Sequence, residues 1–216
     1  MGILMKEHKQ RIVIIGDSFT QGVGDELRGG WTSVFKETFD NKYDILIKGY
    51  GGNNICDVLA RLYKDLIYFS PNIVILQVGI NDSRLRKSLN FSNEVDEKRF
   101  EKGLKKFVDE IRAALKQEIY FILIGTTPVI DELTTPYKED KYYSTIESKK
   151  FDEIIRKFCE SQGILFIDVF DKFAEYSDLR DILIDGVHPN SKGHNIIANT
   201  VISKFKGVIL HRQKKF

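Results

Sequence analysis

Residues 12–20 read Ile-Val-Ile-Ile-Gly-Asp-Ser-Phe-Thr, an apolar run that passes directly into a turn. Four β-branched residues in a row are typical of a strand buried on both faces, as in parallel sheets. A Gly-Asp pair ends the run, and Gly22 and Gly24 continue the turn beyond it. Ser18 therefore lies just beyond the carboxyl end of this strand. In open α/β sheets, ligands bind in a crevice at the carboxyl ends of the strands.

Ser18 is thus a candidate nucleophile. The pair Asp17-Ser18 is equally ordinary helix N-cap or turn chemistry after a strand. This stretch alone leaves both interpretations open.

The length of 216 residues fits one domain, predicted here over 1–216 with its core at about 11–205, because no linker divides the chain. A composition of 42% hydrophobic and 30% charged residues, without repeats, indicates a globular protein. The net charge of +2, from 33 basic and 31 acidic residues, does not indicate the excess of basic residues that is typical of nucleic-acid-binding proteins.

The sequence also bears on location. No apolar run approaches the ~20 residues that cross a bilayer, so no membrane span is predicted. The first ten residues contain no apolar signal-peptide core, and we expect a cytoplasmic location. Cys56 and Cys159 fall in predicted helices at unrelated positions, which indicates buried free thiols rather than a disulfide.

Strand and helix patterns alternate along the whole chain. Strands are predicted at Arg11 to Ile15, Tyr43 to Ile47, Ile73 to Val78, Ile119 to Ile124 and Ile164 to Val169. Helical spacing of apolar residues covers 31–39, 55–69, 100–115, 151–158 and a last segment that begins near Asn190 or Ser191. This alternation predicts a five-stranded parallel sheet covered on both faces, for which we assume the strand order 2-1-3-4-5.

Polar residues follow several of these strands. A serine nucleophile needs a base, and the base needs a partner that fixes its tautomer. Asp185 and His188, three residues apart in one turn, can supply both. The oxyanion of an acyl transfer also needs donors, which the N–H groups of Ser18 and of the turn at 49–52, with the Asn81 amide, can provide.

Each of these features has a simpler explanation. Asp185 could brace a loop, and His188 could mark the entry to a helix. The turn at 49–52 could cradle a phosphate, although it lacks the glycine spacing and the following lysine that such loops carry. Asp185, His188 and His194 could ligate a metal, yet no fourth ligand stands at a recognisable spacing, and no metal is predicted. His194 is better placed on the first turns of the last helix.

The order of the motifs decides between these interpretations. Gly16-Asp17-Ser18-Phe19, the turn Gly49 to Gly52, Gly79-Ile80-Asn81-Asp82 and Asp185-x-x-His188-Pro189 follow one another, three after predicted strands and the last before the final helix. Together they closely resemble the four blocks of the GDSL/SGNH hydrolase superfamily, over nearly the whole chain. The resemblance implies a flavodoxin-like, three-layer α/β/α sandwich around a five-stranded parallel sheet.

The resemblance also implies roles. Ser18 matches the family nucleophile, His188 its general base and Asp185 the residue that orients the histidine. Gly52 through its N–H and Asn81 through its side chain match the oxyanion donors, joined by the N–H of Ser18.

Two positions depart from the family pattern. Ile47 stands where many members have Asn, and Phe19 where many have Leu or Ile. Neither supplies a catalytic group, so the departures concern the shape of the pocket.

These observations predict a serine esterase or acylhydrolase that uses no cofactor and acts on a small-molecule ester. Bulky Phe19 and Trp31, in the segment that leaves the first strand, are candidate substrate-binding residues and favour short acyl groups, such as acetyl on a carbohydrate or other small alcohol. Both could equally be core residues. A lysophospholipase or thioesterase for longer chains, and a non-catalytic flavodoxin-like binding module, are the alternatives, and the oligomeric state stays open.

The segment 129–143 has no clear period and contains Tyr137, Tyr142 and Tyr143. A loop this long in a compact domain is often functional. We expect it to contribute to the site, on the side of the alcohol.

Overall fold

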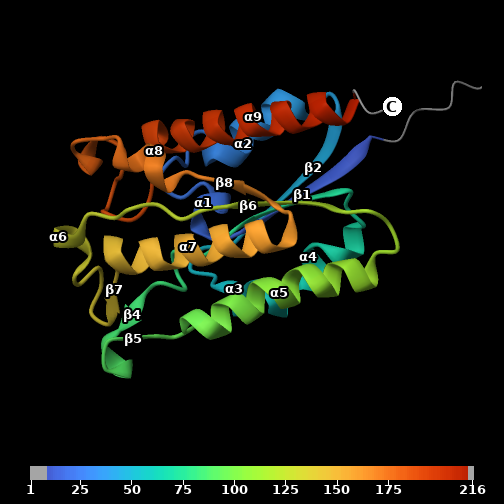
Figure 1. The fold of residues 1–216 in the computed structure, drawn as a ribbon. Helices are drawn as coiled ribbons and strands as arrows, with labels where there is room; N and C mark the ends of the chain where they lie inside the picture. The colour runs from blue at the N-terminus through green and yellow to red at the C-terminus, as the bar shows by residue number, and fades with distance from the viewer. Residues whose placement is uncertain (1–8, 214–216) are drawn as a thin grey trace, which may run out of the picture.

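The computed structural model describes residues 9–213, with a parallel five-stranded sheet at its centre (Figure 1). The strand order is β2-β1-β3-β6-β8, which confirms the order assumed from the sequence. Residues 1–8, which bear on the prediction of no signal peptide, lie outside the described residues. The strands are β1 (Gln10–Gly16), β2 (Tyr43–Gly49), β3 (Ile73–Gln77), β6 (Tyr120–Ile124) and β8 (Leu165–Ile167).

Helices cover both faces of the sheet (Figure 1). On one face lie α2 (Gly30–Phe39), α8 (Phe170–Ala174) and α9 (Ser191–Gln213), and on the other α3 (Ile55–Ala60), α4 (Leu62–Asp65), α5 (Glu97–Ala114) and α7 (Thr145–Gln162). The chain therefore forms a three-layer α/β/α sandwich, and α9 begins at Ser191 as predicted.

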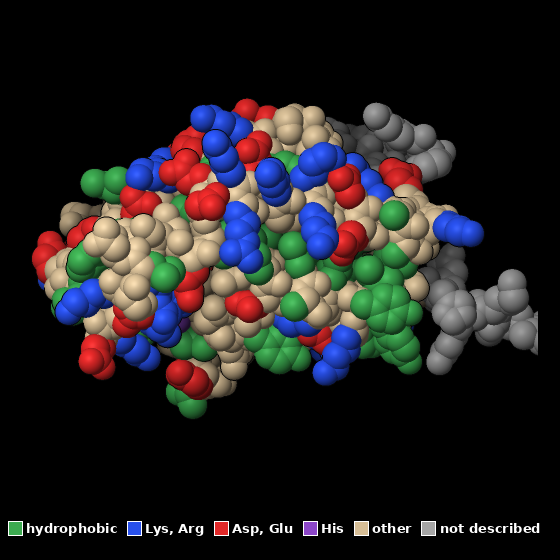
Figure 2. All heavy atoms as spheres, turned by 90° about the horizontal axis from the view of Figure 1, so that it is seen from below, with side chains coloured by type: hydrophobic (Ala, Val, Ile, Leu, Met, Phe, Trp, Pro, Cys, Tyr) green, Lys and Arg blue, Asp and Glu red, His purple; other side chains and the backbone are tan. Residues whose placement is uncertain are grey.

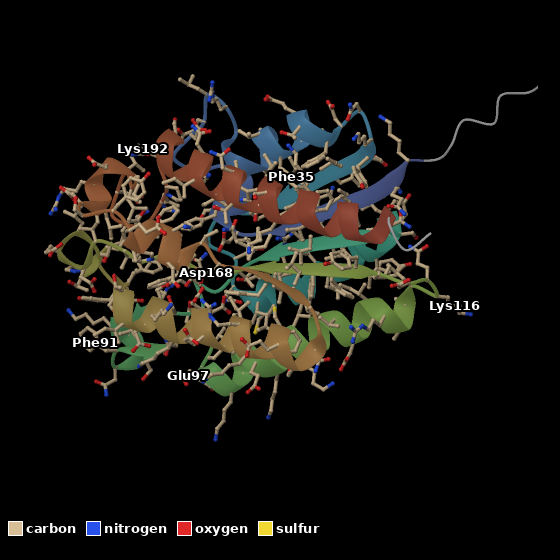
Figure 3. The ribbon with its side chains drawn as sticks, turned by 45° about the horizontal axis from the view of Figure 1, so that its top comes forward. Phe35, Phe91, Glu97, Lys116, Asp168 and Lys192 are labelled. Atoms are coloured by element: carbon tan, nitrogen blue, oxygen red, sulfur yellow. The ribbon has the colours of Figure 1, made fainter. Side chains whose placement is uncertain are left out.

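The alternating side chains of β1 divide the core into two. Ile12 and Ile14 belong to the cluster under α2 and α9, whereas Val13 and Ile15 belong to the cluster under α3, α5 and α7. All four are fully buried, which explains why the run has no polar residue. Figure 3 shows Phe35 of α2 beside α9, where its ring centroid lies 5.1 Å from that of Phe205.

The outer surface of α5 is charged. Lys105 pairs with Asp109, and Lys106 with Glu110, each four residues apart. Figure 2, seen from the side of α5, shows basic and acidic side chains interspersed over this face. None of the described helices is both long and apolar enough to cross a bilayer.

The helix predicted over 55–69 is broken into α3, α4 and the 3-10 helix η1 (Ile67–Phe69). Arg61 stands at the first break, with backbone φ −110° and ψ 7°. Its side chain donates to the Gly16 carbonyl at 2.8 Å and to Asn53 Oδ1 at 2.8 Å. Helical spacing alone does not reveal such tertiary bonds.

A small antiparallel sheet was not predicted. It joins β5 (Ser92–Asn93), β4 (Leu85–Arg86) and β7 (Lys141–Tyr142), strands too short to show a period. The remaining elements are α1 (Ser18–Gln21), α6 (Asp131–Thr134), η2 (Lys87–Leu89) and η3 (Leu179–Asp181). Both cysteines are in helices and free, as predicted, although only Cys159 is fully buried while Cys56 is half-buried.

Candidate active site

Three strand ends lie level at one edge of the sheet. In the register of β1, Gly16 pairs with Gly49 of β2 and with Gln77 of β3. A Cβ on Gly16 would stand 2.2 Å from the Gln77 carbonyl oxygen, so only glycine fits here. The level edge places the segments that follow these strands next to one another.

Ser18 opens the short helix α1 immediately after β1. Asp17 caps this helix, with its Oδ1 accepting the Phe19 N–H at 2.9 Å. Burial raises the pKa of Asp17 to about 7, and the hydrogen bond from Phe19 opposes that rise. Asp17 is therefore a helix N-cap, one of the two interpretations that the sequence left open. This cap fixes the backbone at Ser18.

Ser18, His188 and Asp185 form one continuous chain of hydrogen bonds. Ser18 Oγ lies 3.0 Å from His188 Nε2, and His188 Nδ1 lies 2.7 Å from Asp185 Oδ2. A hydrogen on Nδ1 donates to the carboxylate, which leaves Nε2 to accept the serine hydroxyl. The structure thus brings Ser18 into contact with the Asp185–His188 pair, although 170 positions separate Ser18 from His188.

The turn that carries Asp185 is itself tightly held. Asp185 Oδ1 accepts the N–H groups of Val187 at 3.0 Å and of His188 at 2.7 Å. Burial alone would raise the pKa of Asp185, but the hydrogen bonds from His188 and from the Tyr137 hydroxyl outweigh it and lower the pKa below its ordinary value. Asp185 therefore stays a carboxylate.

Asn81 follows β3 with its side-chain amide fixed at both ends. Its Nδ2 donates to the Asn53 carbonyl at 3.1 Å, and its Oδ1 accepts the Tyr143 hydroxyl at 3.1 Å. An amide nitrogen carries two hydrogens, so one is left over.

The glycine turn after β2 lies beside Ser18. A Cβ on Gly51 would stand 3.9 Å from Ser18 Cβ, whereas one on Gly52 would meet nothing within 4 Å. Gly52 has a φ of +80°, which favours glycine. Among the described residues, neither the Gly52 N–H nor the Ser18 N–H has an acceptor. The glycine turn thus lies next to Ser18, and two of the predicted oxyanion donors have N–H groups that no described residue accepts.

Phe19 and Trp31 lie in the core. The Phe19 side chain is 1% exposed, and its ring centroid lies 6.1 Å from that of His188. Trp31 is 0% exposed and donates its indole N–H to Gln77 Oε1 at 2.8 Å. The structure places Phe19 against the histidine but gives Trp31 no accessible surface.

His194 lies on the first turn of α9, as the sequence indicates. Its Nε2 lies 3.0 Å from the Val23 carbonyl, and its Nδ1 accepts the Trp31 N–H at 3.3 Å. Burial lowers the pKa of His194. Among the side chains that the structure describes, in residues 9–207, no three from His, Cys, Asp or Glu come together in a way that could hold a metal ion.

The contacts of Tyr137 and Tyr143 were not predicted. The sequence indicated only that their segment contributes to the site on the side of the alcohol, whereas their hydroxyls donate to Asp185 and Asn81. No local pattern marks these bonds, because 48 and 62 positions separate the partners.

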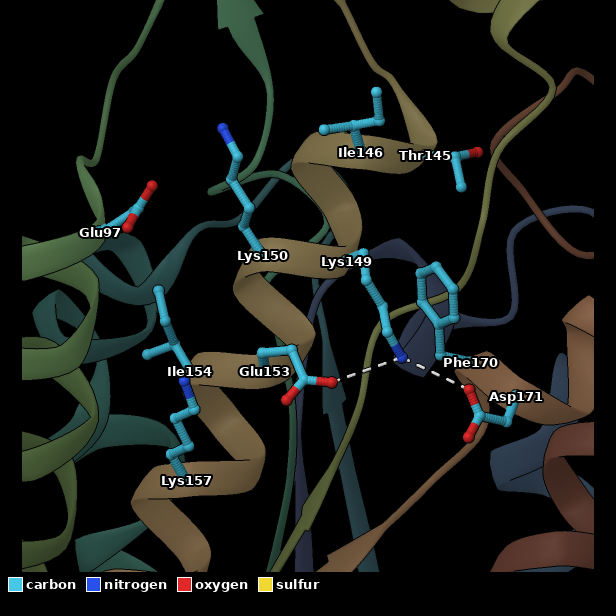
Figure 4. Close-up of a pocket in the computed structure, with 10 residues that line it drawn as sticks. All are labelled: Glu97, Thr145, Ile146, Lys149, Lys150, Glu153, Ile154, Lys157, Phe170 and Asp171. Carbon is cyan, nitrogen blue, oxygen red and sulfur yellow. Dashed lines mark hydrogen bonds and ion pairs between the residues drawn. The ribbon is translucent and has the colours of Figure 1, made fainter.

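A groove of about 610 Å³ lies elsewhere, where α7 meets α8 and the start of α5 (Figure 4). Lys149 pairs there with Glu153 at 3.6 Å and with Asp171 at 3.4 Å. The hydroxyl of Thr145 in its wall donates to the Val129 carbonyl at 2.9 Å. The groove is not lined by Ser18 or His188, and we assign no chemistry to it.

Comparison with known proteins agrees with this geometry. The chain is 24% identical over 213 residues to a GDSL esterase/lipase of Arabidopsis thaliana, covering 94% of this chain and 81% of the relative. It is also 24% identical to an acetylxylan esterase of Geobacillus stearothermophilus, covering 89% of this chain and 92% of that protein.

Among solved structures, a lipase/acylhydrolase from Enterococcus faecalis has the same fold. Its TM-score is 0.75 at 20% identity, with 92% of this chain and 96% of that chain covered. The model of the GDSL-like lipase/acylhydrolase family matches residues 14–196, a span that contains Ser18, Asn81, Asp185 and His188. With this match over most of its length, the chain belongs to the GDSL-like lipase/acylhydrolase family and is an ester-bond hydrolase.

Proposed function

We propose that this hydrolase is a serine esterase that removes short acyl groups, such as acetyl, from a carbohydrate or other small alcohol. The observation that carries the proposal is the hydrogen-bond chain from Ser18 through His188 to Asp185, with distances of 3.0 and 2.7 Å. We also propose that the chain acts as one domain, without a cofactor.

In the proposed acylation step, His188 Nε2 takes the hydroxyl proton of Ser18 while Oγ forms a bond to the ester carbonyl carbon. The carbonyl oxygen becomes an oxyanion, which the N–H groups of Ser18 and Gly52 and the Asn81 amide receive. The intermediate collapses when the bond to the alcohol oxygen breaks and His188 returns the proton to that oxygen. Water then repeats the sequence on the acyl-enzyme and releases the acid.

Asp185 has a separate part in the proposal. Its carboxylate keeps the hydrogen of His188 on Nδ1, so that Nε2 is free to act as the base. It also stabilises the positive charge that develops on the imidazole during each proton transfer.

The proposed preference for acetyl groups has two supports. Acetylxylan esterases of Geobacillus stearothermophilus and Xylanibacter ruminicola are both 24% identical to this chain. Phe19 directly follows Ser18 in the chain, and its buried ring lies edge-on to that of His188, with centroids 6.1 Å apart. A long acyl chain therefore gains little room on that side.

The test uses the purified chain, p-nitrophenyl acetate and a fluorophosphonate probe that labels activated serines. Ser18→Ala should lose both turnover and labelling while the protein unfolds at an unchanged temperature. Ser33→Ala is a matched control, since the Ser33 hydroxyl donates to the carbonyl of Gly29, the residue before α2, and bonds no residue of the proposed site. Labelling that persists in Ser18→Ala would reject Ser18 as the nucleophile.

A further inference from the structure

Two tyrosines at the ends of one hairpin contact the two halves of the proposed site. The hairpin spans 137–143 and closes through the Tyr137 N–H, which donates to the Lys141 carbonyl at 2.8 Å. The Tyr143 N–H donates to the Thr134 carbonyl at 3.0 Å, which ties the hairpin to α6. The Tyr137 and Tyr143 rings meet edge to face, with centroids 5.5 Å apart. The two hydroxyls are therefore held on one local framework.

The Tyr143 hydroxyl contacts the side-chain amide of Asn81. The two ends of an asparagine amide have nearly the same shape, and only their hydrogen bonds fix which end is which. The Tyr143 hydroxyl donates to Oδ1, while Nδ2 donates to the Asn53 carbonyl. Rotation of the amide by 180° would lose both bonds and turn an oxygen toward the oxyanion.

Arg84 supports this arrangement. Its guanidinium lies 3.5 Å from Asn81 Oδ1 and is paired with Glu94. Burial raises the pKa of Tyr143, and the neighbouring Arg84 opposes that rise. Because Tyr143 is buried and keeps its proton, its hydroxyl can donate to Asn81.

Tyr137 contacts the carboxylate of Asp185. Its hydroxyl donates to Oδ2 at 2.7 Å, the same oxygen that accepts His188 Nδ1 at 2.7 Å. Asp185 Oδ1 is already occupied by two backbone N–H groups. The tyrosine therefore shares the oxygen that faces the histidine and restricts the carboxylate to one position.

We propose that Tyr137 and Tyr143 are positioning residues for the ester hydrolysis, with Tyr143 orienting the Asn81 amide toward the oxyanion and Tyr137 holding the Asp185 carboxylate against His188. The inference rests on the proposed function, which assigns Asn81 and Asp185 their roles. One hairpin then controls both the electrostatic stabilisation of the oxyanion and the orientation of the base.

The first experiment measures kcat and KM on p-nitrophenyl acetate for Tyr143→Phe. We expect kcat to fall about tenfold, less than the ~10²–10³ lost when an oxyanion donor is removed outright, while KM changes little. Tyr142→Phe is the matched control, because the Tyr142 ring packs on Phe91 and its hydroxyl bonds no described residue. It should keep the wild-type kcat.

A double-mutant cycle separates positioning from general loosening of the structure. In the Asn81→Ala background the Tyr143 hydroxyl has no amide to orient, so adding Tyr143→Phe should lower kcat no further. A tenfold loss in both backgrounds would mean that Tyr143 only supports the fold, and would overturn its part of the inference.

The second experiment records the pH profile of kcat/KM for Tyr137→Phe. Without the competing hydroxyl, the full charge of Oδ2 faces His188 and favours the protonated imidazole. The acid limb of the profile should therefore move to higher pH, and the low-field proton NMR signal of the Nδ1 hydrogen should change position. An unmoved limb and an unmoved signal would overturn the role of Tyr137.

The two proposals fail in different ways. A wild-type chain that neither turns over short esters nor labels with fluorophosphonate would overturn the proposed function and this inference with it. An active wild type, with both tyrosine variants indistinguishable from Tyr142→Phe, would overturn this inference alone.

Discussion

The Ser18 hydroxyl lies 3.0 Å from His188 Nε2, although 170 positions separate the two residues. The contact depends on how the turn before α9 is anchored. Leu183 and Pro189 form an isolated antiparallel bridge across the turn that holds His188. A Cβ on Gly24 would stand 2.2 Å from the Pro189 carbonyl oxygen, so the loop after α1 packs directly against this turn. The Ser18 hydroxyl and the His188 imidazole are thus positioned by neighbouring loops.

Removal of the Asn81 amide tests the proposed oxyanion site. Asn81→Ala should lower kcat by ~10²–10³, about 2.7–4 kcal/mol, because the donor acts mainly on charge that forms in the transition state. KM should change much less. Steady-state kinetics on p-nitrophenyl acetate measure both constants, and a variant with only a raised KM would show that Asn81 merely binds substrate.

Removal of metal ions tests the proposed division of roles between Asp185 and His188. Exhaustive treatment with a chelator should leave turnover unchanged, because these side chains bond each other at 2.7 Å and in the proposed mechanism act as orienter and base, without a metal. Activity is measured on p-nitrophenyl acetate before and after dialysis. Inactivation that added zinc reverses would contradict the prediction.

The strand ends were predictable because their signals are local. The chain changes direction where the apolar run stops at Gly16 and again at the turn residues 49–52. These signals lie in the local sequence and do not depend on tertiary contacts. The tyrosine contacts were not predictable in this way. They depend on where the hairpin 137–143 docks, and its two-residue strand carries no hydrophobic period.

The difference between local sequence signals and tertiary contacts also explains the broken helix at Arg61 and the position of Trp31. Arg61 interrupts a sound helical pattern because its guanidinium reaches the Gly16 carbonyl, a contact made only in the folded chain. Trp31 looked equally suited to the crevice and to the core. Its partner, Gln77 at the end of β3, becomes visible only once the strands are assembled.

Trp31→Phe distinguishes these two roles of the tryptophan. The change leaves the buried Gln77 Oε1 without its donor, which should lower the free energy of unfolding by about 1–3 kcal/mol. KM for p-nitrophenyl acetate should stay close to the wild-type value, since the side chain is 0% exposed. Urea denaturation and kinetics on the same preparation test both points. A raised KM with unchanged stability would instead indicate contact with substrate.

The buried carboxyl of Asp82 should make the free energy of unfolding depend on pH. Burial, with the nearby charge of Asp17, raises the pKa of Asp82 to about 7, against the opposing hydrogen bond from the Ile55 N–H. The folded chain therefore keeps this proton up to about pH 7, whereas the unfolded chain loses it near pH 4. Between these values the folded state binds more protons, so the free energy of unfolding falls as the pH rises.

The variant Asp82→Asn tests this dependence, since Asn cannot ionise but retains an oxygen for the Ile55 N–H. Its free energy of unfolding should rise relative to that of the wild type as the pH goes from about 5 to 8. Urea denaturation at several pH values gives both curves. Parallel curves would mean that Asp82 does not titrate in this range.

The last prediction concerns the length of the acyl group. Phe19 directly follows Ser18, the proposed nucleophile, and the centroid of its buried ring lies 6.1 Å from that of His188. Acetyl and butyryl esters should therefore be cleaved far better than decanoyl esters. One methylene in an apolar site is worth only ~0.8 kcal/mol, so a strong preference has to come from steric exclusion by this ring. Phe19→Leu, which reduces the volume beside His188, should move the optimum to longer chains. Values of kcat/KM for p-nitrophenyl esters from acetyl to dodecanoyl measure this, and a wild-type maximum at octanoyl or beyond would favour a lysophospholipase or thioesterase instead.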